Sequence, residues 1–111
     1  MVHKNYKWNI SEEKGRIMIS DLIVKVLKET KDNIIDIDEL LFILNNRTKT
    51  VTITNNKKDK TLTNYIKVVF GGIINFIDGD DKLLLEKKDS TTLLKLTDIG
   101  MTDWIFVDDY E

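Results

Sequence analysis

Cysteine is absent from the 111 residues, and histidine occurs only once, as His3. The chain therefore cannot form disulfides or thiolate metal sites. One histidine cannot build a zinc site or a conventional catalytic triad, and no other pairing of a nucleophile with a base is recognisable. We therefore expect a protein that is not an enzyme and that uses no metal or cofactor.

No apolar run approaches the length of a bilayer span, and the opening MVHKNYKWN lacks the apolar region of a signal peptide. An intracellular location is expected, in a cytoplasm or inside a host cell or its nucleus, without membrane contact. Proline and alanine are also missing, whereas isoleucine, lysine and asparagine are abundant. AT-rich codons favour these three residues, so the expected source is an AT-rich genome such as that of a virus, a phage or a microbe.

The length and composition indicate one globular domain. A chain of 111 residues with 41% hydrophobic and 32% charged residues has enough apolar surface for one modest core. The formal net charge is -2, whereas nucleic-acid-binding proteins tend to be basic overall. The distribution of charge along the chain therefore matters more than its total.

The charges separate along the sequence. Between residues 47 and 67, six cations oppose only Asp59, which gives a local charge of +5. From residue 78 onward, ten acids oppose four lysines, which gives -6. A chain with this distribution can present a basic surface despite its net negative charge. The cations of the basic segment are Arg47, Lys49, Lys57, Lys58, Lys60 and Lys67.

Helical periodicity predicts two helices in the first half of the chain. Ser11 is a good N-cap with acidic residues in the turn after it, and the apolar spacing that follows predicts a helix over about residues 11–30. Asp36 and Glu39 have the spacing of a capping box, which predicts a second helix over about residues 36–46. The isoleucines just before it favour a short strand.

The segment that follows changes period. TVTIT alternates and is β-branched, and Asn55 and Asn56 after it are turn residues, so this piece is either a short hairpin or an elaborated turn. Thr61 is expected to cap a third helix over about residues 61–72. The glycines at 71 and 72 each weaken a helix by about 1 kcal/mol relative to alanine. An end near Phe70, with IINFI as a strand, is the alternative.

The last part of the chain predicts a β-hairpin. KLLLEK, KDST and TLLKLT have the pattern of strand, tight turn and strand, which places the hairpin over about residues 82–97. The final stretch, MTDWIFVDDYE, has an apolar centre at residues 104–107 that is expected to pack on the core as a strand or a short helix. The expected organisation is an arm over residues 1–10 and a single domain over residues 11–111.

Residues 61–100, TLTNYIKVVFGGIINFIDGDDKLLLEKKDSTTLLKLTDIG, resemble the recognition helix and wing of winged helix-turn-helix proteins. Leu96, Thr97 and Gly100 match the phrase L-T-x-x-G that closes the wing in members of that superfamily. The order of expected elements agrees over most of the chain, although the link between the second and third helices exceeds the usual three or four residues. The resemblance implies an α+β fold, a small three-helix winged helix-turn-helix with a C-terminal hairpin wing.

The resemblance also implies a function. A small winged helix of this kind would bind double-stranded DNA as a transcriptional regulator, with the third helix in the major groove and the wing on the backbone. Lysines near the start of that helix would neutralise phosphates, and an asparagine can read adenine. The expected DNA-binding residues are Arg47, Lys49, Lys57, Lys58, Lys60, Thr61, Thr63, Asn64, Lys67, Lys87 and Lys88, with Ser90 and Thr91 beside the last two at the wing tip.

Several alternatives stay open from the sequence. Such proteins often act as dimers on half-sites about one helical turn apart, so a homodimer formed through the first helix or the stretch at 104–107 is one expectation. The superfamily also includes RNA binders and protein-interaction modules. As a module of the latter kind, the chain would use its acidic C-terminal third to dock a basic partner such as a polymerase subunit or a host factor. In the plainest interpretation, the lysines only solvate a loop, Thr61 is only a cap, and Tyr65 belongs to the core.

Overall fold

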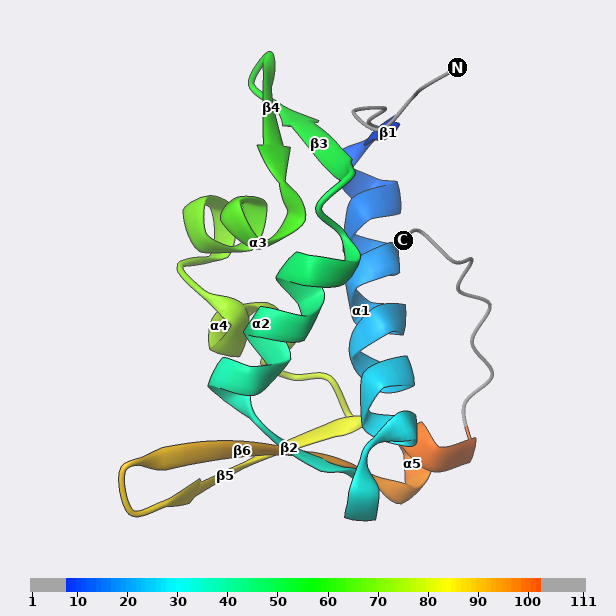
Figure 1. Ribbon diagram of the computed structural model, residues 1–111, viewed down its shortest axis with the longest axis vertical. Coiled ribbons are helices and arrows are strands. Elements are labelled where there is room, and N and C mark those ends of the chain that lie inside the picture. Colours follow the sequence, from blue (N-terminus) through cyan, green and yellow to red (C-terminus); the bar gives the residue numbers. More distant parts are fainter. Residues whose placement is uncertain (1–7, 103–111) are drawn as a thin grey trace.

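Helices and short strands alternate along the chain in the computed structural model, which describes residues 8–102 (Figure 1). The expected α+β class is confirmed. The helical elements are α1 (Glu12–Glu29), the 3-10 turn η1 (Lys31–Asn33), α2 (Ile37–Arg47), α3 (Leu62–Tyr65), the π-helical turn η2 (Ile66–Phe70), α4 (Ile73–Ile77) and α5 (Asp98–Thr102). The strands are β1 (Trp8–Ile10), β2 (Ile34–Asp36), β3 (Val51–Asn55), β4 (Lys58–Thr61), β5 (Leu83–Lys88) and β6 (Thr91–Leu96).

The strands form two small sheets at opposite ends of the molecule (Figure 1). One sheet has the order β2-β6-β5 and is antiparallel throughout, with Ile35 and Leu85 both opposite Leu94. The other sheet has the order β1-β3-β4, with β1 parallel and β4 antiparallel to β3. Because β3 and β4 pair, the segment between the second and third helices is a hairpin, the first of its two expected forms.

The first two helices begin where their caps predict. The Ser11 hydroxyl accepts a hydrogen bond from the Lys14 amide at 3.2 Å. The Asp36 carboxylate accepts hydrogen bonds from the Asp38 and Glu39 amides at 2.8 and 3.4 Å. Both predicted helices are confirmed to within one residue at each end, and each starts one residue later than expected because the capping residue itself is not helical.

The third helix is shorter than expected. It begins after Thr61, whose hydroxyl accepts a hydrogen bond from the Asn64 amide at 3.2 Å, and its π-helical last turn ends at Phe70 rather than at residue 72. Gly71 has φ +80° and Gly72 has φ +134°. Only glycine adopts the second of these conformations without strain. A right-handed helix cannot continue through such dihedrals, so the two glycines set the boundary.

The run IINFI forms helix α4, so its alternative interpretation as a strand is wrong. Its two buried residues, Ile73 and Ile77, are four positions apart, whereas a strand would bury alternate residues. The side-chain amide of Asn75 donates to the Phe70 carbonyl at 2.9 Å, which ties α4 to the end of η2. A run of five residues is too short for periodicity to separate a helix from a strand.

The core lies between α1, α2, the helical segment from α3 to α4, and one face of each sheet. At Gly15 the helix α1 approaches β3 so closely that a Cβ atom would overlap the Ile53 side chain. Tyr65 was expected in the core and has no exposed surface, so that expectation is confirmed. The fully buried side chains include Ile23, Leu40, Val51, Ile53, Tyr65 and Leu94, which come from both long helices, both sheets and α3.

The predicted C-terminal hairpin is confirmed as β5–β6. Thr97 and Gly100, which follow it, anchor α5. The Thr97 hydroxyl donates to the Asp81 carbonyl at 2.7 Å and accepts from the Gly100 amide at 3.2 Å. A Cβ atom on Gly100 would lie 2.7 Å from the Lys82 carbonyl oxygen and would overlap Leu96. Thr97 therefore caps α5, and the missing side chain at Gly100 lets α5 pack against the start of the hairpin.

The chain ends differ in part from expectation. Residues 8–10, the last part of the predicted arm, form β1 and pair with β3. Trp8 in this strand is 43% exposed. Residues 1–7 and 103–111, including the apolar stretch at 104–107, lie outside the described residues. Within residues 8–102, no helix has the length and apolar character needed to cross a membrane.

Replacing Gly100 with alanine is expected to lower the free energy of unfolding by about 1–3 kcal/mol, the usual cost of forcing a methyl group into a packed site. The new methyl group would meet a backbone oxygen, which cannot rotate away as a side chain can. Urea denaturation followed by circular dichroism measures the change. Ile99→Ala, at an exposed site in the same helix, is the control and should change stability by less than about 0.5 kcal/mol. Equal stability of the two variants would contradict the packing described for Gly100.

Candidate nucleic-acid interface

The basic segment folds into one continuous unit of hairpin and helix. Strand β4 ends at Thr61 and α3 begins at the next residue, Leu62, so no linker separates them. Thr61 serves both elements, because it pairs with Thr52 in the sheet and caps the helix with its hydroxyl. The hairpin therefore stands directly at the start of α3 (Figure 1).

The tip of this hairpin carries two exposed lysines, Lys57 and Lys58. Asn55 pairs with Lys58, and the two residues between them, Asn56 and Lys57, have φ of +54° and +64°. Positive φ at both central positions is typical of a type I′ turn, whose twist suits a hairpin. Neither lysine side chain has a partner within residues 8–102, so both ammonium groups are available at the surface.

A polar network holds the end of the hairpin next to its turn against α1 and α3. The Tyr65 hydroxyl donates to Glu12 Oε1 at 2.9 Å and accepts from Arg16 Nη1 at 3.2 Å. The other carboxylate oxygen, Glu12 Oε2, accepts from the side-chain amide of Asn55 at 3.2 Å. Lys60, one of the expected DNA-binding residues, donates from Nζ to the carbonyl and Oδ1 of Asn55 at 3.3 and 3.4 Å. Elements far apart in the sequence are thus joined through one carboxylate.

The network changes the protonation behaviour of its members. The hydrogen bonds from Asn55 and Tyr65 lower the pKa of the Glu12 carboxyl, and the positive charge of Arg16 contributes less. Burial raises the pKa of the Tyr65 hydroxyl. The hydrogen bond to Tyr65 raises the pKa of the Arg16 guanidinium. At neutral pH the network therefore contains an ionised carboxylate, a neutral phenol and a charged guanidinium.

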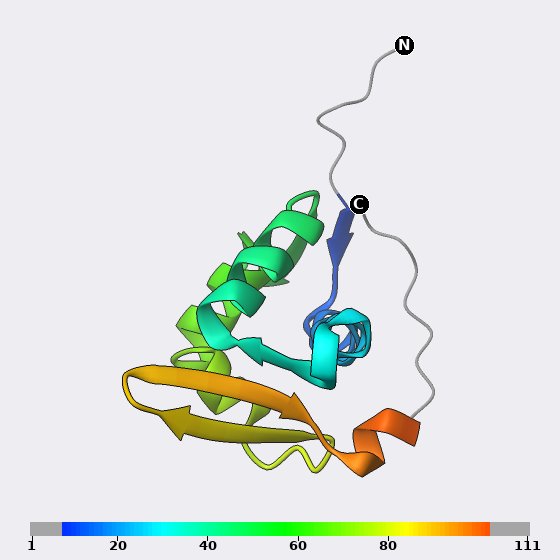
Figure 2. The same cartoon turned by 60° about the horizontal axis from the view of Figure 1, so that its bottom comes forward.

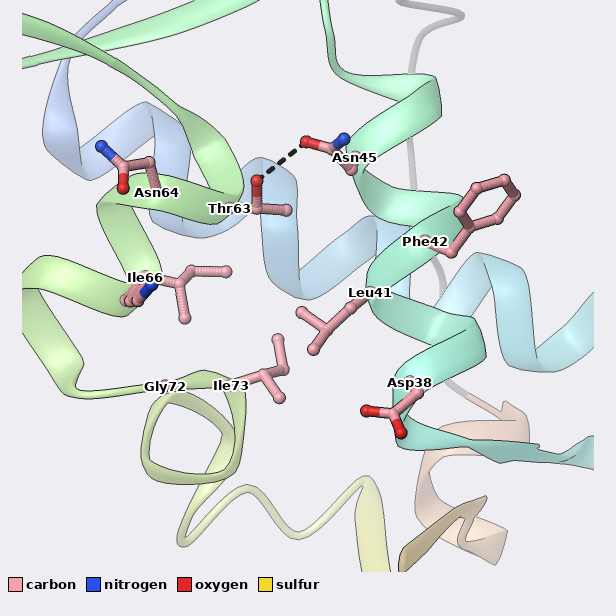
Figure 3. Close-up of a pocket in the computed structure, with 10 residues that line it drawn as sticks. Asp38, Leu41, Phe42, Asn45, Thr63, Asn64, Ile66, Gly72 and Ile73 are labelled. Carbon is pink, nitrogen blue, oxygen red and sulfur yellow. Dashed lines mark hydrogen bonds between the residues drawn. The ribbon is translucent and has the colours of Figure 1, made fainter.

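Three more of the expected DNA-binding residues are engaged within the chain. Arg47 Nη1 forms an ion pair with Glu29 Oε1 at 3.4 Å, which links the ends of α2 and α1. The Thr61 hydroxyl caps α3. The Thr63 hydroxyl donates to Asn45 Oδ1 at 3.0 Å, which links α3 to α2 (Figure 3). The structure thus gives these side chains a positioning role between elements.

The remaining expected residues are exposed, and their side chains have no partner in the part of the chain that the structure describes. At the turn of the β5–β6 hairpin, Ser90 is exposed and Thr91 is half buried. An exposed side chain without a partner is free to meet a ligand. The exposed residues are Lys49 in the turn after α2, Lys57 and Lys58 at the hairpin tip, Asn64 and Lys67 on the third helix, and Lys87 and Lys88 on β5.

These residues form two basic hairpin tips, with Asn64 and Lys67 of the third helix between them. In Figure 1 the β3–β4 and β5–β6 hairpins lie at opposite ends of the molecule, and α3 and α4 lie between them. Figure 2 shows that the tip of β5–β6 extends away from α1, toward the side on which α3 and α4 lie. Cations spread over this length suit an extended anionic ligand better than a small one.

Beside the third helix lies an apolar pocket of about 570 Å³ that was not predicted from the sequence (Figure 3). Leu41, Ile66 and Ile73 point into it, and Phe42 projects beside it with 67% of its surface exposed. The run LLFIL at residues 40–44 is the part of the sequence that could have indicated an exposed apolar site. Five consecutive apolar residues cannot all lie on the buried face of a helix. The polar lining of the pocket consists of Asp38, Asn45, Thr63, Asn64 and Lys67.

No protein-family model, curated protein or solved structure matches the chain. Within residues 8–102, no three acidic or histidine side chains are grouped in a way that would hold a metal ion. The choice between functions therefore depends on the exposed lysines, on Asn64 and on the apolar pocket.

Glu12 is expected to make the protein less stable in acid. Because its pKa in the folded chain is below the ordinary value of 4.5, its stabilising contribution is complete above that value and is lost as the pH falls through the folded-state pKa. Glu12→Gln removes this proton-linked contribution. The free energy of unfolding of the variant should therefore fall less than that of the wild type between about pH 6 and pH 3. Urea denaturation across this range measures both slopes.

Glu13→Gln, in the same turn of α1, is the matched control for this experiment. Glu13 makes no hydrogen bond to Tyr65 or Asn55, so this variant should keep the wild-type dependence on pH. If Glu12→Gln also kept it, the network would not be contributing to stability as described.

Proposed function

We propose that this protein is a winged helix that binds double-stranded DNA and acts as a transcriptional regulator. The order α1, β2, α2, α3, β5, β6 is the order that the resemblance to winged helix-turn-helix proteins implies. In this interpretation the β5–β6 hairpin is the wing, and β2 adds a third strand to its sheet. The recognition helix is α3 together with η2.

The observation that carries the proposal is the exposed surface of this helix. Asn64 and Lys67 lie one turn apart, are exposed, and have no side-chain partner within the described residues. An asparagine can bond both N6 and N7 of adenine, and a lysine can bond guanine or a phosphate. Thr63 is already bonded to Asn45. We therefore assign base contact to Asn64, and contact with guanine or phosphate to Lys67.

The exposed lysines would supply the sequence-independent part of the binding, because each lysine that meets a phosphate releases counterions from the DNA. The wing does not oppose this, since residues 83–96 contain three lysines and two acids. Residues 103–111 contain four acids and no cation, so -4 of the -6 in the C-terminal third lies outside the described residues. The charge of the described wing thus favours DNA over a basic protein partner.

Binding alone would be the mechanism of regulation. The helix would enter the major groove, the wing tip would bind the adjacent backbone, and the bound protein would block or recruit a polymerase. The mechanism involves no covalent chemistry by the side chains. A homodimer would place two such helices on half-sites about one helical turn apart.

The apolar pocket favours a second candidate function, that of a protein-interaction module. Phe42 is 67% exposed beside a pocket of about 570 Å³, which is a suitable place for an apolar side chain of a partner but not for a DNA backbone. Asp38 in the lining would suit a basic group next to that side chain. Phe42→Ser should then abolish binding of the partner and leave DNA binding intact, whereas Lys87→Ala with Lys88→Ala, outside the pocket lining, should weaken only DNA binding.

Binding to random duplex DNA is expected to depend strongly on salt, with a loss of affinity of roughly a hundredfold or more between about 50 and 200 mM. Lys67→Ala should weaken binding to all sequences alike and reduce the slope of log affinity against log salt by about one. Asn64→Ala should keep the slope and lose about tenfold of the preference for the best selected site. Fluorescence anisotropy with labelled duplexes measures all three.

Lys31→Ala is the control for these variants, because Lys31 is exposed and lies beyond the end of α1. Its salt dependence should equal that of the wild type. Failure of the wild type to bind duplex DNA at about 50 mM salt would overturn the proposed function.

A further inference from the structure

The β3–β4 hairpin occupies the place where a helix-turn-helix protein has a turn of three or four residues. Here the connection covers residues 48–61 and forms two paired strands. A connection that only joined two helices would need no basic tip, yet Lys57 and Lys58 are exposed there. The hairpin thus repeats a property of the wing, where Lys87 and Lys88 are exposed next to the turn.

The backbone of this hairpin is fixed to the rest of the molecule. Strand β1 pairs with β3 on the side away from β4. The Asn9 side-chain amide donates to Thr54 Oγ1 at 2.7 Å, and Thr54 Oγ1 donates to Asp59 Oδ1 at 2.8 Å, so all three strands are linked by side chains as well. Ile53, the central residue of β3, is fully buried. A hairpin held in this way loses little freedom when its tip meets a ligand, which favours binding.

The molecule is somewhat longer than one turn of DNA along the axis that separates the two hairpins. They lie toward opposite ends of the long axis of the molecule, which measures 44 Å (Figure 1). One turn of B-DNA measures about 34–36 Å. Helix α3 lies between the hairpins, on the side toward which the wing tip extends (Figures 1 and 2). A duplex that crosses α3 along this axis would pass both basic tips.

We propose that the β3–β4 hairpin is a second wing, and that one copy of the protein binds about one turn of DNA with both hairpins at once. Lys57 and Lys58 bind phosphates on one side of α3, and Lys87 and Lys88 bind phosphates on the other side. This inference rests on the proposed DNA-binding function. It adds the length of the site and makes one copy sufficient to fill it.

The test combines duplex length with removal of charge from each hairpin. The duplexes have about 8 and about 16 base pairs, because only the longer one exceeds a turn of about 10 base pairs. The control removes the same charge from the exposed residues Lys28 and Lys31 near the end of α1. The hairpin variants are Lys57→Ala with Lys58→Ala, Lys87→Ala with Lys88→Ala, and all four substitutions together.

On the longer duplex, each pair of substitutions should reduce the slope of log affinity against log salt by about two, because two phosphate contacts are lost. All four substitutions together should reduce this slope by about four. The shorter duplex can reach only one tip at a time. On that duplex the variant with all four substitutions should therefore reduce the slope by no more than about two. The control should follow the wild type on both duplexes.

A wild-type slope for Lys57→Ala with Lys58→Ala on the longer duplex would overturn the second wing. The second wing would also be overturned if the variant with all four substitutions reduced the slope equally on both duplexes. The proposed function is tested separately, because it requires only that the wild type binds and that Lys67→Ala weakens binding on both lengths. The four hairpin lysines are exposed, and their side chains make no hydrogen bond or ion pair within the described residues, so circular dichroism and thermal unfolding of the hairpin variants should be unchanged.

Discussion

The Glu12 carboxylate receives hydrogen bonds from Tyr65 on α3 and from Asn55 on β3, and the arrangement of the basic surface depends on these two bonds. Tyr65 is fully buried, and a buried hydroxyl that loses its partners costs about 1–3 kcal/mol. The helix therefore cannot slide along α1 without that cost. Because the hairpin is bonded to the same carboxylate, the hairpin and the helix keep one arrangement relative to α1.

The backbone supplies a second constraint at the other end of the helix. Gly71 and Gly72 have positive φ, so the chain turns sharply and α4 returns Ile73 and Ile77 to the core. The turn just before them, Ile66–Phe70, is π-helical, a rare conformation that often occurs at functional sites. The helix is consequently short, and its free polar groups are Asn64 in α3 and Lys67 in the π-helical turn.

The parts of the fold that depend on neighbours in the sequence were predictable. The caps at residues 11, 36 and 61 and the C-terminal hairpin lie where their patterns place them. Contacts between distant residues were not predictable, because no local pattern encodes them. Thr63 and Arg47 were both expected to meet DNA, yet Asn45 and Glu29, each eighteen positions away, hold them. Strand β1 was missed because three residues carry no periodicity, and the pocket because it forms only when α2 packs beside α3 and η2.

The direct joint between β4 and α3 also has a consequence for the DNA in the proposed complex. A protein that cannot adjust the position of its hairpin relative to its helix leaves the adjustment to the duplex. Bending or twisting a duplex costs energy that depends on base sequence, and pyrimidine–purine steps such as TA deform most easily. The protein would then prefer flexible steps between its contacts. Its choice of site would be influenced by base pairs that no side chain touches.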